Sequence, residues 1–212
     1  MTTNATATAP TPDLSVDVEA NSDSAASPPI RVWDPLVRSF HWLLAAAFAT
    51  AYIVEDHALD IHVWAGYLAL SLIGVRLLWG LIGTRHARFR DFVRGPTQIL
   101  AYLKNLFSLH APRYLGHNPA GGAMIVLLLV AILATGLTGI ALYGAEEFAG
   151  PLAPMMRGLP EFWGEALEET HEFLANATLA LVVLHLLGVA VSSLLHRENL
   201  VKAMITGVKR GS

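Results

Sequence analysis

Four histidines lie in or at the edge of apolar stretches, and two of them share the stretch HEFLANATLALVVLH, from His171 to His185. On an α-helix this spacing places the two imidazoles about 40° apart around the axis and about 21 Å apart along it. Both rings then face the same way at two depths. Ionisable side chains within a membrane are costly and commonly functional. Metal ligation is the chemistry that these residues favour, and two satisfied core histidines are the structural alternative.

The composition is that of a membrane protein without covalent cofactor links. Of the 212 residues, 54% are hydrophobic and 15% are charged, and the mean hydropathy is +0.48. A soluble domain of this size is less apolar. There is no cysteine, which excludes disulfides, cysteine-ligated iron–sulfur clusters and covalent c-type haem attachment. Any haem must therefore be held by non-covalent contacts and axial ligands.

The remaining chain divides into a polar tail and one membrane domain. Residues 1–28 contain Asp and Glu but no Lys or Arg, and we expect a disordered acidic tail that is no signal peptide. Residues 29–212 are predicted to form a four-helix transmembrane bundle, all-α and without strands. The apolar runs cover about 36–54, 62–82, 122–143 and 171–195. Each is about as long as a helix that crosses the hydrocarbon core.

One further helix is predicted outside the four apolar runs. Within Gly95–Leu109, Pro96 is suited to a first helical position, and apolar residues recur at helical spacing after it. This pattern favours an amphipathic helix on the membrane surface, with an ordinary loop helix as the alternative.

The basic residues predict the orientation of the bundle. Of the 14 Lys and Arg residues, all except Arg157 lie before or at the start of the first run, around the long second link or after the fourth run. Basic residues are enriched on the cytoplasmic side of membrane proteins. Both termini and the second link are therefore predicted to be cytoplasmic, and the opposite, periplasmic side is rich in Glu and Asp.

This topology pairs the four histidines by depth. The first run enters from the cytoplasm, which places His41 near that face, whereas His62 opens the second run at the periplasmic face. Since the fourth run also enters from the periplasm, His171 is expected at the depth of His62 and His185 at that of His41. Two neutral imidazoles on opposite faces of a flat macrocycle are the arrangement of a b haem. Two b haems, one in each half of the membrane, are therefore predicted.

Other residues near these histidines have weaker assignments. Gly66, Ala175 and Thr178 could give a macrocycle clearance or could serve helix packing. Arg38 and Arg76 could pair with haem propionates, or could reach the polar boundary of the membrane. His196 could line a quinone pocket or meet a propionate, and a surface histidine at a helix end is the alternative. Solvated loop positions are predicted for His57, His86, His110 and His117.

Several segments resemble the bacterial cytochrome b561 family, which groups with the b-type cytochrome subunits of nickel–iron hydrogenases. The resemblance covers about Arg31 to Arg210, and the fourth run is its most specific part. The other segments that carry it are RSFHW, HVWAGYLALSLIGVRLLWG, HNPAGG and RENLVKAMITGVKR. It implies a four-helix membrane protein that holds b haems and moves electrons between quinones and redox partners. It also implies haem ligation by His41, His62, His171 and His185, the residues that depth pairing gives independently.

The resulting hypothesis is an inner-membrane di-haem cytochrome b. It is expected to exchange electrons between the quinone pool and a periplasmic c-type cytochrome or hydrogenase-like enzyme, either alone or as the cytochrome b subunit of an oxidoreductase. Membrane lipids surround it, and no nucleic-acid partner is expected. One alternative is a stand-alone quinol oxidase that acts on oxygen or superoxide. Another is a non-redox transporter or scaffold whose histidines relay protons.

Overall fold

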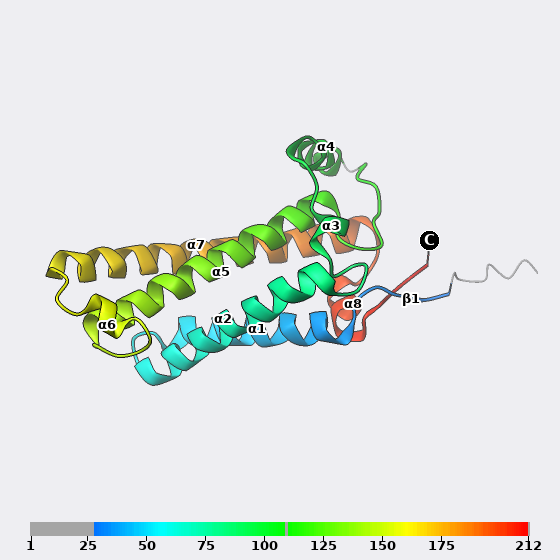
Figure 1. Ribbon diagram of the computed structural model, residues 1–212. Coiled ribbons are helices and arrows are strands. Elements are labelled where there is room, and N and C mark those ends of the chain that lie inside the picture. Colours follow the sequence, from blue (N-terminus) through cyan, green and yellow to red (C-terminus); the bar gives the residue numbers. More distant parts are fainter. Residues whose placement is uncertain (1–27, 109, 212) are drawn as a thin grey trace, which may run out of the picture.

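Four long apolar helices form the body of the protein. The computed structural model describes residues 28–108 and 110–211. Within this part, each of four helices is long and apolar enough to cross a membrane. They are α1 (Pro35–Val54), α2 (Leu59–Ile82), α5 (Pro119–Glu146) and α7 (Glu161–Leu195) (Figure 1). The predicted four-helix membrane fold is confirmed, whereas the predicted tail, apart from residue 28, lies outside the described residues.

Two of these helices begin at the same kind of local signal. Asp34 and Asn118 are the N-cap residues of α1 and α5, and their side chains accept hydrogen bonds from the backbone N–H groups of Val37 and Gly121. A proline follows each cap, where its missing N–H costs nothing. α7 begins at Glu161, ten residues before the predicted start. The segment EFWGEALEET is too polar to extend an apolar run, yet it is rich in good helix formers.

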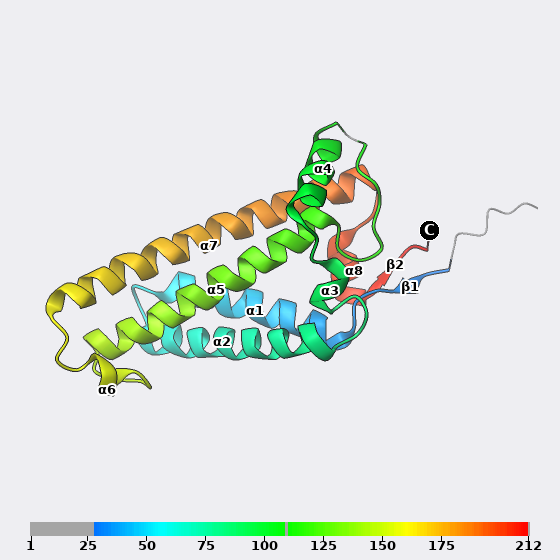
Figure 2. The same ribbon diagram turned by 45° about the horizontal axis from the view of Figure 1, so that its top comes forward.

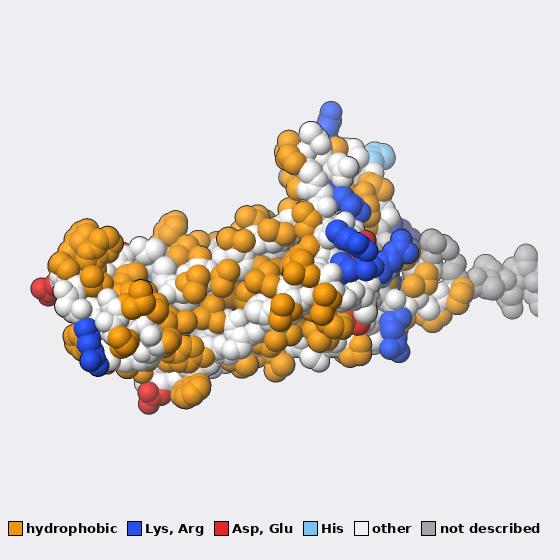
Figure 3. All heavy atoms as spheres, viewed as in Figure 1, with side chains coloured by type: hydrophobic (Ala, Val, Ile, Leu, Met, Phe, Trp, Pro, Cys, Tyr) orange, Lys and Arg blue, Asp and Glu red, His pale blue; other side chains and the backbone are white. Residues whose placement is uncertain are grey.

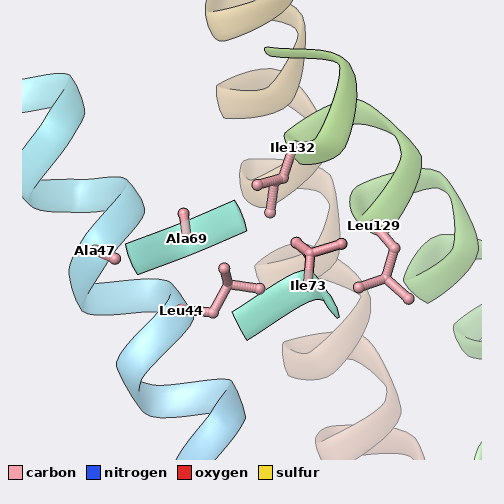
Figure 4. Close-up of a cluster of buried hydrophobic side chains, with 6 residues drawn as sticks. All are labelled: Leu44, Ala47, Ala69, Ile73, Leu129 and Ile132. Atoms are coloured by element: carbon pink, nitrogen blue, oxygen red, sulfur yellow. The ribbon is translucent and has the colours of Figure 1, made fainter. Parts of the chain in front are cut away.

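The four helices form two hairpins that meet through α2 and α5. α1 packs along α2, α5 packs along α7, and α2 contacts α5 (Figures 1 and 2). Their common core is a small cluster of aliphatic side chains from α1, α2 and α5 (Figure 4), formed by Leu44, Ala47, Ala69, Ile73, Leu129 and Ile132. The alanines allow close helix approach in an apolar environment, where packing rather than water exclusion holds helices together.

Large apolar side chains cover the outside of the bundle as well. Exposed examples from all four helices are Ile53, Leu78, Leu127 and Leu186, and apolar atoms extend along the whole body (Figure 3). A continuous apolar exterior of this kind fits a lipid environment.

The short elements gather mainly at one end of the bundle. They are α3 (Phe89–Phe92), α4 (Pro96–Phe107) and α8 (Leu200–Thr206), whereas α6 (Ala153–Met156) lies at the other end. The predicted helix that begins at Pro96 is confirmed as α4, and it runs across the long axis of the bundle (Figure 1). The prediction of no strands is wrong. β1 (Ile30–Arg31) pairs antiparallel with β2 (Val208–Lys209), and strands of two residues are too short for an alternating pattern.

Charge divides the molecule into two ends. α1 begins, α2 ends, α5 begins and α7 ends at the same end, which carries every Lys and Arg except Arg157 in or near its elements and links. We call this the basic end, and most of the basic side chains visible in Figure 3 lie there. The opposite end, here called the acidic end, carries Glu55, Asp56, Asp60, Glu146, Glu147, Glu161, Glu165, Glu168 and Glu169.

Asp34 ties the start of α1 to the end of α2. Besides capping Val37, its carboxylate accepts hydrogen bonds from the Trp79 indole at 3.1 Å and the Thr84 hydroxyl at 2.6 Å. Partial burial raises the pKa of this carboxyl, but the hydrogen bonds from Thr84, Val37 and Trp79 outweigh burial and lower it overall. The bonded carboxylate therefore stabilises the fold above the usual pKa of an aspartate, and this stabilisation is lost as the pH falls through the lowered value.

Replacement of Asp34 tests whether it connects the start of α1 to the end of α2. Asp34→Ala should lower the free energy of unfolding by about 2 kcal/mol, since it removes a helix cap and the hydrogen bonds from Trp79 of α2 and from Thr84 just beyond that helix. Asp34→Asn should lower the free energy of unfolding by less, because an amide oxygen can still cap α1. Thermal unfolding in detergent, followed by circular dichroism, measures the difference. Equal melting temperatures for Asp34→Ala and the unsubstituted protein would contradict the assigned role.

Candidate functional site

The structure brings His62 and His171 together near the acidic end. His62 is in the first turn of α2, His171 is ten residues into α7, and their ring centroids lie 5.9 Å apart. The Nδ1–H of His62 donates to the carbonyl oxygen of Ala51 at 2.9 Å, and that of His171 donates to the carbonyl oxygen of Thr135 at 2.9 Å. Both rings are therefore oriented by the backbone of a neighbouring helix.

These hydrogen bonds fix the chemical form of the two imidazoles. A carbonyl oxygen can only accept, so in each neutral ring Nδ1 carries the proton and Nε2 keeps its lone pair. A metal-binding histidine commonly has this arrangement, in which the second nitrogen donates to a carbonyl and raises the basicity of the first. His62 and His171 are thus prepared to act as ligands through Nε2.

Glycines make room for the His171 ring. A Cβ at Gly139 would lie 2.8 Å from Cε1 of His171. Because a helical side chain leans toward the preceding turn, the absence of one at Gly139 also leaves the Thr135 carbonyl accessible. A pocket between α2, α5 and α7 adjoins the pair, and its lining includes His62, Gly66, Tyr67, Gly136, Tyr143 and His171.

The small residues predicted to give clearance differ from one another. A Cβ at Gly66 would meet nothing within 4 Å, which fits a role in leaving space. Thr178 does not share this role. It is fully buried, and its hydroxyl lies 3.3 Å from that of Thr135, so it belongs to the packing between α5 and α7.

His41 and His185 form the second pair, nearer the basic end. Their ring centroids are 6.5 Å apart, across the space between α1 and α7. These two helices do not pack along each other, and side chains bridge them instead, as in the hydrogen bond from the Tyr52 hydroxyl to Asn176 at 2.7 Å. The Nδ1 atom of His41 is buried and has no hydrogen-bond partner among the described residues. Within residues 28–108 and 110–211, this pair has no orienting bonds like those of His62 and His171.

The two arginines predicted to meet haem propionates have different surroundings. Arg38 donates from Nη1 to the carbonyl oxygen of Ile205 at 2.5 Å, which ties α1 to α8. Arg76 is only 3% exposed, and its guanidinium lies 5.0 Å and 5.9 Å from the ring centroids of Phe89 and Phe92. Arg76 is therefore enclosed by aromatic rings and not exposed on the surface of the protein.

His117 was predicted to be a solvated loop residue, and this prediction is wrong. Its ring centroid lies 4.4 Å from that of Trp33 and 4.9 Å from that of Phe92, and its Nδ1 is buried without a partner among the described residues. Burial, followed by the charges of Arg76 and Lys209, lowers the pKa of His117 to about 3. The signal in the sequence was Asn118-Pro119, which starts a helix, because the residue before an N-cap commonly packs back onto the structure. His57 and His110 are exposed as predicted.

The geometry of the two histidine pairs suits a ligand that completes the coordination of a metal. Among residues 28–108 and 110–211, no group of three or more His, Cys, Asp or Glu residues could hold a metal ion. Each pair therefore offers two nitrogens, and the remaining ligands must come from elsewhere, as they do from a porphyrin. With metal–imidazole bonds of about 2 Å, two imidazoles on opposite sides of one metal have ring centres about 6 Å apart. The observed 5.9 Å and 6.5 Å fit this spacing.

Comparison with models of protein families supplies the deciding observation. Residues 32–207 match prokaryotic cytochrome b561. The chain belongs to this family. As a prokaryotic cytochrome b561 it is a multi-pass membrane protein that binds b-type haem and transfers electrons, as the sequence resemblance predicted. Neither the comparison with curated proteins nor that with solved structures found a match.

The close approach at Gly139 generates a prediction for this cytochrome. Gly139→Val should displace the His171 ring and lower the content of b-type haem, since the added side chain occupies the position of the imidazole. Gly74→Val is the matched control, because Gly74 is also helical but is exposed and has open space beside it. The pyridine haemochrome assay measures haem per protein. Equal losses in the two variants would mean that the ring position at Gly139 is unimportant.

Proposed function

We propose that this cytochrome b561 holds two b haems and transfers electrons between the quinone pool and a redox protein on the opposite side of the inner membrane. In this proposal His62 and His171 are the axial ligands of one haem, and His41 and His185 are those of the other. The observation that carries it is the pair of ring separations, 5.9 Å and 6.5 Å, at two levels of the bundle. Residues 29–212 form the membrane cytochrome domain.

The continuity of α7 supports two sites rather than one. His171 and His185 lie on a single uninterrupted helix, which separates them by about 21 Å along its axis. Neither histidine could therefore serve the site of the other. A bound haem supplies one-electron redox chemistry, and two imidazoles per iron leave no open coordination position, which favours electron transfer over oxygen chemistry.

The distribution of charge supports an orientation for this transfer. Because basic residues concentrate on the cytoplasmic side of membrane proteins, the basic end is proposed to be cytoplasmic, together with both termini. The acidic end then faces the periplasm. There, exposed Glu161, Glu165 and Glu168 lie in the first turns of α7, beside exposed Phe162 and Trp163. An acidic surface suits a partner with a basic docking face, such as a small c-type cytochrome, or a hydrogenase-like enzyme.

Quinone chemistry is proposed at the basic end. A quinone head group needs hydrogen-bonding groups that can reach protons, and His196 caps α7 there in a half-buried position. The stand-alone quinol oxidase is the second candidate, and it is favoured only if quinol-dependent oxygen consumption occurs without a partner. Family membership disfavours the non-redox transporter or scaffold.

Single histidine replacements test the pairing of ligands. His171→Ala and His62→Ala should each remove the same haem, because each leaves one imidazole without its opposite ligand. His185→Ala and His41→Ala should remove the other. Haem content and the low-temperature difference spectrum of the purified protein identify which haem remains. If His62→Ala and His185→Ala deplete the same spectral component, the pairing is wrong.

Charge and hydrogen-bonding replacements test the two exchange sites. His196→Ala should slow reduction by quinol while both haems stay bound. Charge reversal at Glu161, Glu165 and Glu168 should weaken exchange with a basic c-type cytochrome, most strongly at low ionic strength, where screening is weakest. Stopped-flow absorbance measures both rates. The proposed direction across the membrane fails if the glutamate reversals slow quinol reduction and His196→Ala does not.

A further inference from the structure

We propose that Arg76 and His117 form a carboxylate-binding site beside the His41–His185 pair, and that it holds a propionate group of the haem at that pair. The inference rests on the proposed haem ligation and extends it in two ways. It selects Arg76 over Arg38 as the main cationic partner, and it assigns a cofactor contact to His117, a residue in the link between α4 and α5.

Arg76 is a buried cation without a counter-ion. It is 3% exposed, and its Nη1 has no hydrogen-bond partner among the described residues. The ion pairs among the described residues are Arg88–Asp91, Arg113–Glu198 and Lys209–Glu198, and none of them includes Arg76. Asp34 is a nearby carboxylate, but it binds Val37, Trp79 and Thr84. Buried charges are normally paired, so the missing negative charge is expected from a ligand.

The fold holds this cation in place without neutralising it. The rings of Phe89 and Phe92, from α3, lie against the guanidinium, and such contacts orient a cation but leave its charge. α3 fits here because two helices lack side chains where it approaches. A Cβ at Gly80 would lie 2.0 Å from Phe89, and one at Gly122 would lie 2.6 Å from the Phe92 carbonyl oxygen.

His117 supplies a second polar group around the same ring. Phe92 contacts both the Arg76 guanidinium and the His117 imidazole, and the Nδ1 of His117 is buried without a partner. The low pKa keeps this imidazole neutral at physiological pH, so it can donate one hydrogen bond while adding no charge. A guanidinium fork together with a neutral donor is well suited to a carboxylate.

The position of the cluster identifies the source of the carboxylate. Arg76 is near the end of α2 and His117 directly precedes the N-cap of α5, so the cluster lies toward the same end of the bundle as His41 and His185. The charges of Arg76 and His185 both lower the pKa of His117, which agrees with this placement. A quinone carbonyl is uncharged and would leave the Arg76 charge uncompensated. Arg38 is less suited, because its guanidinium already binds the Ile205 carbonyl oxygen of α8. A haem propionate satisfies both the charge and the location.

The test compares haem with haem dimethyl ester, in which both carboxylates are blocked. Haem-depleted protein carrying His171→Ala, which leaves one histidine pair intact, is titrated with each compound and followed by Soret absorbance. Haem should bind at least tenfold more tightly than the ester. Arg76→Gln should reduce this ratio to nearly one, His117→Ala should reduce it in part, and Arg76→Lys should retain part of it. Arg90→Gln, which removes an exposed cation from α3, should leave it unchanged.

A second measurement uses the haem-loaded protein, in case a variant cannot be depleted and refilled. Because a nearby cation favours the reduced, less positive haem, Arg76→Gln should lower its midpoint potential more than Arg90→Gln does. Equal binding of haem and ester by the parent protein, or equal effects of the two replacements, overturns the carboxylate site. If Arg76→Gln slows quinol reduction but leaves the ratio of haem affinity to ester affinity unchanged, the carboxylate site is also overturned, and the cluster is assigned to quinone. Failure of the parent protein to bind any haem refutes the proposed ligation itself.

Discussion

The hydrogen bond from His171 to the Thr135 carbonyl oxygen joins the two longest helices of the molecule. It depends on Gly139, since a side chain there would collide with the imidazole and cover the carbonyl. In an apolar surrounding no water can replace such a bond, so the His171 ring, together with the Thr135–Thr178 contact, helps to fix the rotation of α7 against α5. The same bond leaves the lone pair of the His171 ring on Nε2, and the hairpin of α1 and α2 places the His62 ring centroid 5.9 Å from that of His171.

The buried polar groups at the two ends of the bundle differ in whether they have hydrogen-bond partners. At the acidic end both ring nitrogens that face the backbone have carbonyl partners. Toward the basic end, the buried polar atoms without partners among the described residues belong to Arg38, His41, Arg76, Tyr102 and His117. Buried polar groups in folded proteins are nearly always satisfied. The acidic-end histidines are thus oriented by the chain itself, whereas the buried polar groups toward the basic end lack such partners among the described residues.

Much of this architecture could be predicted from the sequence because lipid restricts the choices. Apolar runs long enough to cross a membrane must be helices, and alternating direction then fixes the depths of His41, His62, His171 and His185. The early start of α7 was missed because Glu161–Thr170 is polar although helical. The place of His117 was missed because the helix start at Asn118-Pro119 indicates only that the preceding residue packs back onto the structure, whereas its neighbours Trp33 and Phe92 are distant in sequence.

The pairing of β1 with β2 imposes an order on assembly. Ile30 pairs with Lys209 and Arg31 with Val208, so residues near the start of the described chain need partners near its end. Val32 and Trp33 likewise donate their N–H groups to the carbonyl oxygen of Gly207. During synthesis the four long helices can insert one after another, but this clasp cannot form until β2, which follows all four of them in the chain, has been made. Closure of this clasp at the basic end therefore follows the synthesis of all four long helices.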